Sequence, residues 1–371
     1  MSGPQKGLLA VAMSGGLDSS VTAWLLSKGD RPVIGLSMLL WDHSGVEAHG
    51  RCCGALDLGD AKRVAQQAGI PHYTLRMDED FRRQVVDPFV QDYLEGRTPS
   101  PCVRCNTWIK FDLLLERARR LGAERVATGH YARILDGPGG PELHTAVDAG
   151  KDQSYYLFEL TQEQLAASLF PLGAMTKGEV RALAREAGLA VAGKGESMEV
   201  CFVSGGVREF VEAQVAEHPE RFGTVAEPAP STLVDTAGRE LGTGQPYYRY
   251  TVGQRRGLGL AARSPLYVLA IEPEENRVVV GEEEALLAPG LQGERLHWIG
   301  ADPSLGEAGE VEATVKIRSR HPGVAARIRP LDKGEVEVRF AEPQRGVTPG
   351  QAAVFYQGTR VLGGCWIRGR L

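Results

Sequence analysis

Two groups of residues in this chain have the types and spacing to do chemistry: a glycine- and serine-rich loop near the N-terminus and a Cys-x-x-Cys pair. The loop is Ser14–Ser19 (Ser-Gly-Gly-Leu-Asp-Ser), and it directly follows the apolar run Leu8–Ala12. Glycines without a Cβ let the backbone approach a phosphate closely, the serines supply hydroxyl donors, and the N–H groups at the start of the next helix favour an anion. The loop therefore predicts a phosphate-binding site between a strand and a helix.

The loop lacks both the Gly-Lys-Ser/Thr ending of a Walker loop and the G-x-G-x-x-G pattern of dinucleotide-binding proteins. It resembles instead the loop of ATP pyrophosphatases, enzymes that cleave ATP between its α and β phosphates. The structural alternative is an ordinary strand-to-helix turn in which Asp18 or Ser19 caps the helix. Two glycines, two serines and an aspartate in this order favour the ATP site.

The second group lies in the segment Thr98–Asn106 (Thr-Pro-Ser-Pro-Cys-Val-Arg-Cys-Asn), which contains Cys102 and Cys105. Two prolines fix the backbone before the pair, so we expect a turn that presents both sulfurs on one side, followed by a helix from about Thr107. Arg104 and the N-terminus of that helix both favour the thiolate form. The pair is therefore suited to sulfur chemistry.

Zinc and iron–sulfur binding are other uses of a Cys-x-x-Cys pair. A structural zinc site needs a second Cys/His pair at comparable spacing. The chain has no second Cys-x-x-Cys, and the adjacent Cys52 and Cys53 are too close together to replace one. Cys201, which precedes Phe202 and Val203, would on its own be assigned to the core.

The composition limits the class of protein. Hydrophobic residues make up 43% of the chain and charged residues 24%, as in soluble globular proteins. The formal net charge is −5, so any nucleic-acid surface must be local. No apolar run reaches the roughly 18 residues that span a membrane, and no signal peptide is evident, so we expect a cytoplasmic protein. Six cysteines in so long a chain do not form a disulfide framework.

The elements that must position these groups form an alternating pattern. Apolar runs predict buried parallel strands at Leu8–Ala12, Pro32–Leu39, His72–Leu75 and Arg125–Thr128. Between them, segments with helical spacing predict helices at Ser19–Ser27, Leu56–Gly69, Glu79–Leu94 and Lys110–Leu121. This pattern predicts an α/β domain with a doubly wound parallel sheet, whose ligands collect at the carboxyl ends of the strands.

Two further regions come after the α/β domain in the chain. We expect a catalytic domain over residues 1–204, a small central α+β domain over 205–264 and a C-terminal β-barrel over 265–371. The barrel is expected because short alternating strands with regularly spaced turns begin near Pro265, the first two at Leu266–Ile271 and Arg277–Val280.

Several short motifs are distributed along the chain between Gly7 and Ile367. In chain order they are the phosphate loop, Pro-Cys-Val-Arg-Cys-Asn (101–106), Thr-Gly-His-Tyr-Ala-Arg (128–133), Lys-Asp-Gln-Ser-Tyr (151–155), Cys-Phe (201–202), Tyr-Thr-Val-Gly-Gln-Arg-Arg-Gly-Leu (250–258) and Thr-Pro-Gly-Gln-Ala (348–352). Together they resemble the bacterial tRNA-specific 2-thiouridylase (MnmA) family of the ATP pyrophosphatase superfamily.

The resemblance implies ATP-dependent 2-thiolation of the wobble uridine (position 34) of tRNA. ATP would activate O2 of the uridine as an adenylate, with Mg²⁺ on the triphosphate, because AMP leaves far more readily than a carbonyl oxygen. The residues that the resemblance assigns to ATP are Ala12, Met13, Ser14, Gly15, Gly16, Leu17, Asp18, Ser19, Met38 and Gly129.

The resemblance also assigns roles to the cysteines. Cys105 matches a catalytic thiol, and Cys201 matches the cysteine that accepts a persulfide from a sulfur-relay protein or a cysteine desulfurase. Release of the sulfur by Cys105 would leave a Cys105–Cys201 disulfide for reductants to open. Many family members carry Asn and Asp where this chain has Ser100 and Cys102, and a thiol does not replace Asp as an acid/base group. Cys102, Cys105 and Cys201 could instead hold a [4Fe–4S] cluster, so both mechanisms stay open.

The resemblance and the basic stretch of the barrel suggest where tRNA binds, with tRNAs for Lys, Glu and Gln as the family expectation. The contacts expected are Ser100, Pro101, Cys102, His130, Lys151, Asp152, Gln153, Arg255, Arg318 and Ser319, with Arg320, His321, Arg327 and Arg329 close by. Solvated barrel strands are the alternative for the last group, and Tyr131 and Tyr155 are expected to be packing residues.

Two other functions compete with tRNA thiolation. Another ATP pyrophosphatase, such as an amidating synthetase, would need no pair of distant thiols. A non-catalytic tRNA-binding or iron–sulfur-binding protein would show no tRNA-dependent conversion of ATP to AMP.

Overall fold

A parallel sheet of five strands forms the N-terminal region of the computed structural model, which describes residues 7–41, 55–195, 200–203, 205–222, 229–300 and 309–371. In spatial order the strands are β3 (His72–Arg76), β2 (Val33–Leu39), β1 (Leu8–Ala12), β4 (Ala123–Ala127) and β7 (Ser168–Leu169), and every pairing is parallel. The strands β1 and β2 are almost wholly apolar, as expected where both faces are covered.

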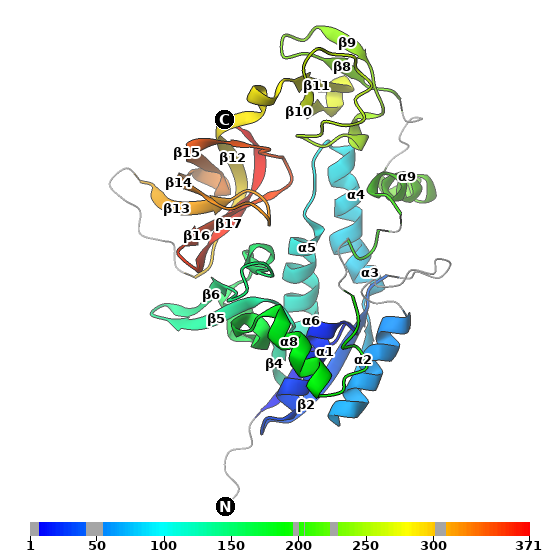
Figure 1. Ribbon diagram of the computed structural model, residues 1–371, viewed down its shortest axis with the longest axis vertical. Helices are drawn as coiled ribbons and strands as arrows, with labels where there is room; N and C mark the ends of the chain where they lie inside the picture. Colours follow the sequence, from blue (N-terminus) through cyan, green and yellow to red (C-terminus); the bar gives the residue numbers. More distant parts are fainter. Residues whose placement is uncertain (1–6, 42–54, 196–199, 204, 223–228, 301–308) are drawn as a thin grey trace, which may run out of the picture.

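Helices cover both faces of this sheet, which confirms the doubly wound α/β prediction (Figure 1). Leu9 and Val11 of β1 pack on one face against α1 (Leu17–Ser27), α2 (Ala55–Ala68) and α8 (Lys177–Glu186). Ala10 faces the other side, which is covered by α3 (Asp78–Phe81), η1 (Arg82–Val86), α4 (Asp87–Leu94), η2 (Cys105–Leu113), α6 (Leu114–Arg120) and α9 (Val207–Glu217). The short helix α5 (Pro101–Arg104) precedes η2, and its Val103 packs instead in a cluster shared with the barrel. Shorter helical segments are η3 (Ser154–Leu157), α7 (Gln162–Ala166), η4 (Pro171–Ala174) and α10 (Pro219–Phe222).

The Cys-x-x-Cys pair lies within a helix, so the expectation of a turn followed by a helix from Thr107 is wrong. The helix begins at Pro101, because proline at the first helical position loses no hydrogen bond and its fixed φ suits the helix. The run changes from α to π geometry at Cys105. The two cysteines also differ in burial, since Cys102 is exposed and Cys105 is buried.

A separate four-stranded sheet follows, in the order β10-β11-β8-β9. Its elements are β8 (Thr232–Val234), β9 (Glu240–Thr243), η5 (Tyr247–Arg249), β10 (Tyr267–Glu272), η6 (Pro273–Glu275) and β11 (Arg277–Gly281). The assignment of the strands at 266–271 and 277–280 to the barrel is therefore wrong. β11 pairs in parallel with β8, which places Arg277 beside Thr232. Because these residues are far apart in sequence, the spacing of the strands along the chain could not predict the pairing.

The C-terminal strands form a closed barrel, as predicted, because β12 pairs with both β15 and β17. Its elements are η7 (Glu283–Leu286), β12 (Leu287–Trp298), β13 (Val311–Lys316), β14 (Val324–Pro330), η8 (Asp332–Gly334), β15 (Val336–Arg345), β16 (Ala352–Gln357) and β17 (Arg360–Arg370). A hairpin from the N-terminal region, β5 (Ala132–Gly137) and β6 (Gly140–Thr145), extends the barrel sheet where His144 pairs with Arg360.

The three sheets surround a long helical run. In Figure 1 the parallel sheet lies at one end and the four-stranded sheet at the other, with the barrel beside the run that contains α5. The helix carrying the cysteines therefore lies between the sheet that supports the phosphate loop and the barrel. Among the described residues, no helix has the length and apolar character to cross a membrane.

Candidate active site

The phosphate loop lies between β1 and α1, as predicted. Gly15 has a φ of 72°, and a Cβ there would lie 2.0 Å from the carbonyl oxygen of Asp57 in α2. Ser14 and Ser19 close the loop, because the Ser14 N–H donates to Ser19 Oγ at 3.2 Å and the two hydroxyl oxygens are 3.2 Å apart. Gly16, at the N-cap of α1, has no side chain to bond the first-turn N–H groups, so the helix start suits an anion.

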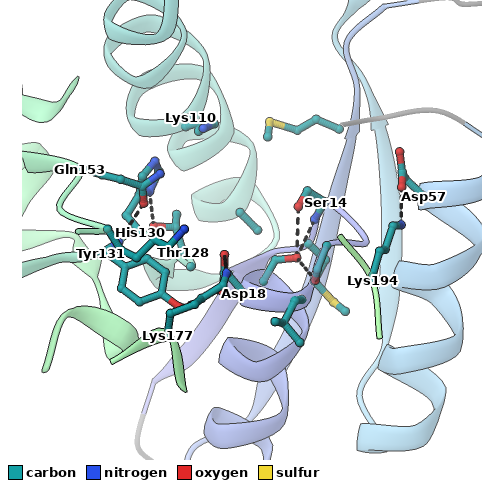
Figure 2. A pocket seen from close by; sticks show the side chains of 18 of the residues that line it. Ser14, Asp18, Asp57, Lys110, Thr128, His130, Tyr131, Gln153, Lys177 and Lys194 are labelled. Atoms are coloured by element: carbon teal, nitrogen blue, oxygen red, sulfur yellow. Dashed lines mark hydrogen bonds and ion pairs between the residues drawn. The ribbon is translucent and has the colours of Figure 1, made fainter. Parts of the chain in front are cut away.

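A pocket of about 320 Å³ opens beyond this loop (Figure 2). It is lined by all but one of the residues predicted for ATP, namely Ala12, Met13, Ser14, Gly16, Leu17, Asp18, Ser19, Met38 and Gly129. Gly15, the remaining residue, lies within the loop. A Cβ at Gly129 would lie 2.9 Å from Ser19 N, so glycine lets the end of β4 approach the start of α1.

Four lysines also line the pocket: Lys110, Lys151, Lys177 and Lys194. Among the described residues that line it, Asp18 and Asp57 carry the carboxylates, so positive charge is in excess and suits a polyphosphate. Sequence reasoning assigned Lys151 to tRNA and missed the other three as pocket residues. Each is a single lysine on a different element, and no spacing links them.

Lys177 and Tyr131 hold the carboxylate of Asp18. The Lys177 ammonium lies 2.7 Å from both carboxylate oxygens, and the Tyr131 hydroxyl donates to Oδ1 at 2.9 Å. Lys177 is buried at the first position of α8, where a capping box between Thr176 and Glu179 sets the helix start. Tyr131 is buried as predicted, and its hydroxyl also orients the acidic residue of the phosphate loop.

Lys194 joins the phosphate loop to α2 on the opposite wall of the pocket. Its ammonium donates to the Gly15 carbonyl at 3.0 Å, to Asp57 Oδ1 at 2.5 Å and to Asp60 Oδ2 at 2.7 Å. Burial opposes its charge, but these two carboxylates outweigh burial and raise the pKa of Lys194. The segment that leads toward Cys201 is thus tied to the phosphate loop.

His130 forms part of the pocket wall. Its Nδ1 lies 2.7 Å from the Thr128 hydroxyl, and its ring contacts Phe111 and Phe170 at centroid distances of 5.6 and 5.8 Å. Burial, with a smaller contribution from Lys110, holds the pKa of His130 well below its ordinary value, so the imidazole is neutral. Its contact with tRNA stays a prediction.

The segment after β6 shapes the mouth of the pocket. The Asp152 carboxylate accepts from the Ala146 N–H at 3.0 Å and from the Ser154 hydroxyl at 2.8 Å. Gln153 Oε1 accepts from the Tyr131 N–H at 2.9 Å. Asp152 therefore fixes the turn from which Lys151 and Gln153 reach the pocket.

Cys105 and Cys201 belong to the same apolar cluster, on the face of the sheet covered by α4 and α6. Cys105 is 8% exposed and Cys201 is half-buried. Phe202 fixes the position of Cys201, because its ring is buried against Phe81 and Phe89 at 5.6 and 5.1 Å. Cys105 and Cys201, the two thiols predicted to react, therefore contact the same apolar cluster.

The cysteines do not meet around a single metal ion. Among the described residues, no group of three or more Cys, His, Asp or Glu side chains could hold a metal ion, and this includes Cys102, Cys105 and Cys201. Cys52 and Cys53 lie outside the described residues. Cys365 is buried inside the barrel, and burial raises its pKa, which favours an inert thiol.

The residues predicted to contact tRNA do not form one patch. His130, Lys151 and Gln153 line the pocket described above, and Ser100 and Pro101 are buried at the start of α5. Arg255 is exposed beside the four-stranded sheet, whereas in the barrel Arg318 is exposed and Ser319 is half-buried. Tyr156 lies between the start of α5 and the barrel turn, since its hydroxyl bonds to Ser319 and its pKa, which burial raises, also responds to the nearby Cys102 and Arg320. The barrel turn at 318–320 therefore lies near the exposed cysteine.

Three family models match consecutive parts of the chain. They are described as a tRNA methyl transferase HUP domain (residues 8–205), a tRNA methyl transferase PRC-barrel domain (222–282) and an aminomethyltransferase β-barrel domain (289–367). A tRNA-specific 2-thiouridylase of Geotalea uraniireducens is 49% identical over 365 residues, which cover 97% of this chain and 94% of that protein. The chain belongs to the tRNA-specific 2-thiouridylase family.

Further members of the tRNA-specific 2-thiouridylase family match equally well. That of Geobacter metallireducens is 50% identical, with 97% of this chain and 96% of the relative covered. That of Solibacter usitatus is 48% identical, with 97% and 98% covered. The resemblance inferred from the motifs is confirmed, and it includes both the phosphate loop and the thiol region.

Proposed function

We propose that this chain catalyses the ATP-dependent 2-thiolation of the wobble uridine (position 34) in tRNA, with tRNAs for Lys, Glu and Gln as substrates. The main support is that a pyrophosphatase-type loop and four lysines form one pocket in a chain that is 49% identical over nearly its whole length to a tRNA-specific 2-thiouridylase. A tRNA substrate also implies a cytoplasmic enzyme.

The first step activates the uridine. Its O2 attacks the α-phosphorus of ATP, the bond from that phosphorus to the bridging oxygen breaks, and pyrophosphate leaves. Lys177 and Lys194 stand on opposite walls of the pocket (Figure 2), where Lys177 would face the charge of the leaving group and Lys194 would hold the phosphate loop against α2. Asp18 is the carboxylate of the loop, and Mg²⁺ typically binds phosphate oxygens together with one or two carboxylates.

The second step transfers sulfur. The terminal sulfur of a persulfide on Cys201 attacks C2 of the uridine, and AMP leaves with O2. The Cys105 thiolate then attacks the Cys201 sulfur, the S–S bond to the substrate breaks, and its electron pair stays on the sulfur at C2. The products are 2-thiouridine and a Cys105–Cys201 disulfide, which a dithiol reductant reopens. A sulfur-relay protein or a cysteine desulfurase supplies the persulfide.

The test is mass spectrometry of tRNA nucleosides after incubation with ATP, Mg²⁺ and a persulfide donor. We expect 2-thiouridine at position 34, with one AMP formed for each sulfur transferred. Iron and sulfide analysis of the same preparation separates the two mechanisms, because the two-thiol route predicts full activity in iron-free protein. Active protein that depends on bound iron would overturn that route, and AMP formation without tRNA would favour an amidating synthetase.

A further inference from the structure

The barrel reaches the cysteine helix through five side chains, here called the Glu159 network: Arg104, Thr107, Glu159, Arg295 and Trp366. Arg104 and Thr107 belong to the helix, whereas Arg295 and Trp366 come from β12 and β17 of the barrel. Glu159 follows η3 and is 9% exposed. Burying a carboxylate costs free energy unless hydrogen-bond donors surround it, and at a contact between two regions both can supply them.

Glu159 receives those donors from opposite sides. The Trp366 indole N–H donates to Oε1 at 2.7 Å, and an Arg295 guanidinium nitrogen lies 3.5 Å from the same oxygen. Oε2 lies 3.1 Å from the Thr107 hydroxyl. That hydroxyl is also 3.0 Å from the Val103 carbonyl, but the charged carboxylate is the stronger acceptor for its single proton.

Arg104 makes the second connection. Its guanidinium carbon lies 5.6 Å from the centre of the Trp366 ring, within the range of cation–π attraction. Asp92, an 8% exposed carboxylate in α4, lies 3.7 Å from the guanidinium. Arg104 is therefore fixed between the barrel and the helix that precedes it.

These contacts flank Cys105. Arg104 directly precedes this cysteine and Thr107 follows two residues later, and the helix changes from α to π geometry at Cys105. A π segment is uncommon and is found frequently at functional sites. The barrel thus contacts the helix on both sides of the point where its geometry changes.

A backbone contact holds the same helix at its start. The Thr98 N–H donates to the Pro349 carbonyl at 2.9 Å, and the Gln351 amide donates to the carbonyls of Thr98 and Pro99 at 2.9 and 3.2 Å. Gly350 between them has a φ of 87°, and a Cβ there would lie 3.0 Å from the Thr98 oxygen. The segment before the helix therefore rests on a barrel loop.

We propose that the barrel sets the orientation of Cys105, and that Glu159, Thr107 and Trp366 are the positioning residues through which it acts. The importance of this orientation rests on the proposed function, in which the Cys105 thiolate attacks the Cys201 sulfur and releases 2-thiouridine. The barrel is then part of the sulfur-transfer site as well as a surface for tRNA.

The test measures the pH dependence of Cys105 alkylation by iodoacetamide in the full-length protein, read by peptide mass spectrometry. The variants are Thr107→Val, Glu159→Gln and Trp366→Phe, which keep the approximate size and remove the hydroxyl, the charge or the indole N–H. The controls are Thr107→Ser, which keeps the hydroxyl, and Trp298→Phe, whose ring packs on Phe355 elsewhere in the same barrel.

We expect the three variants to shift the midpoint of the profile by about one pH unit or to change the alkylation rate about tenfold, whereas the controls match wild type. Profiles that coincide with wild type in all three variants would overturn the proposal. If Trp366→Phe fails to fold, as judged by thermal unfolding, Thr107→Val with its Thr107→Ser control decides the question. The assay uses no tRNA, so a Cys105→Ser protein that still thiolates tRNA would refute the proposed sulfur step without altering this result.

Discussion

The phosphate pocket and the thiol region contact the same parallel sheet, yet they are built in opposite ways. The pocket is polar, and its charged groups are held by short ion pairs such as that between Lys177 and Asp18 at 2.7 Å. The thiols of Cys105 and Cys201 belong to an apolar cluster. The difference fits the two tasks proposed for these regions, because activation by ATP would need fixed charges, whereas a persulfide would need shelter from water and other thiols.

Serine in place of Cys105 or Cys201 separates the two regions most sharply. We expect 2-thiouridine formation to fall by about 10³-fold or more, because each sulfur forms or breaks a bond in the proposed reaction. Binding of a non-hydrolysable ATP analogue, measured by calorimetry, should not change. Cys102→Ala is the matched comparison, since its exposed sulfur has no part in the two-thiol route, and equal losses in all three variants would favour a cluster instead.

Loss of the Lys177 charge should damage the pocket and spare the thiols. We expect Lys177→Met to slow tRNA-dependent AMP formation by about 10²–10³-fold, because Asp18 loses its ion-pair partner and the leaving group loses a positive charge. Loading of Cys201 from a persulfide donor, followed by mass spectrometry, should remain normal. Lys28→Met, at an exposed lysine that packs on Trp24, serves as the control. Unaltered AMP formation in Lys177→Met would show that the ion pair is only structural.

Two glycine-to-alanine substitutions test how rigid the pocket wall is. Gly15→Ala would place a Cβ 2.0 Å from the Asp57 carbonyl oxygen at a φ of 72°. Because the left-handed conformation alone costs about 1–2 kcal/mol, we expect ATP binding to weaken by at least about tenfold. Gly59→Ala, in α2 with no atom within 4 Å of the new Cβ, should stabilise the protein by about 0.5–1 kcal/mol. Equal ATP affinity in the two variants would contradict a rigid loop.

The same contrast explains how much the sequence could predict. Four of the five strands of the parallel sheet, and the position of the phosphate loop between β1 and α1, were predicted correctly, because short segments with local patterns determine them. The two-residue strand β7 was not predicted. The start of the cysteine helix at Pro101 was missed, since the prolines before it suggested a turn. The pairing of β8 with β11 was also missed, because it joins residues that no local pattern relates.

The candidate site divides in the same way. The loop residues and Gly129 were found from contiguous motifs, but Lys110, Lys177 and Lys194 meet only after folding. Lys177 is the first residue of α8, and nothing in the sequence indicated that its side chain reaches Asp18. The same holds for Glu159 and Trp366, which lie far apart in sequence and form a hydrogen bond of 2.7 Å.

The last expected effect concerns the pH dependence of stability and comes from His130 in the pocket wall. Burial keeps its pKa well below 6.5 in the folded protein, so on acidification the unfolded chain takes up a proton that the folded protein does not. Stability must therefore fall as the pH drops below about 6.5, by up to about 1.4 kcal/mol at pH 5.5 from this residue. His130→Gln should remove this part of the pH dependence. The measurement is the change in the free energy of urea unfolding between pH 7.5 and 5.5, compared between wild type and the variant.

His72 and His321, whose pKa values burial also lowers, are present in both proteins and cancel in that difference. An identical pH dependence in wild type and His130→Gln would mean that the folded protein protonates this imidazole, and the wall of the pocket would then carry charge. That outcome would weaken the contrast between the regions, because a protonated His130 beside Lys110 would need an anion in the pocket even before ATP binds.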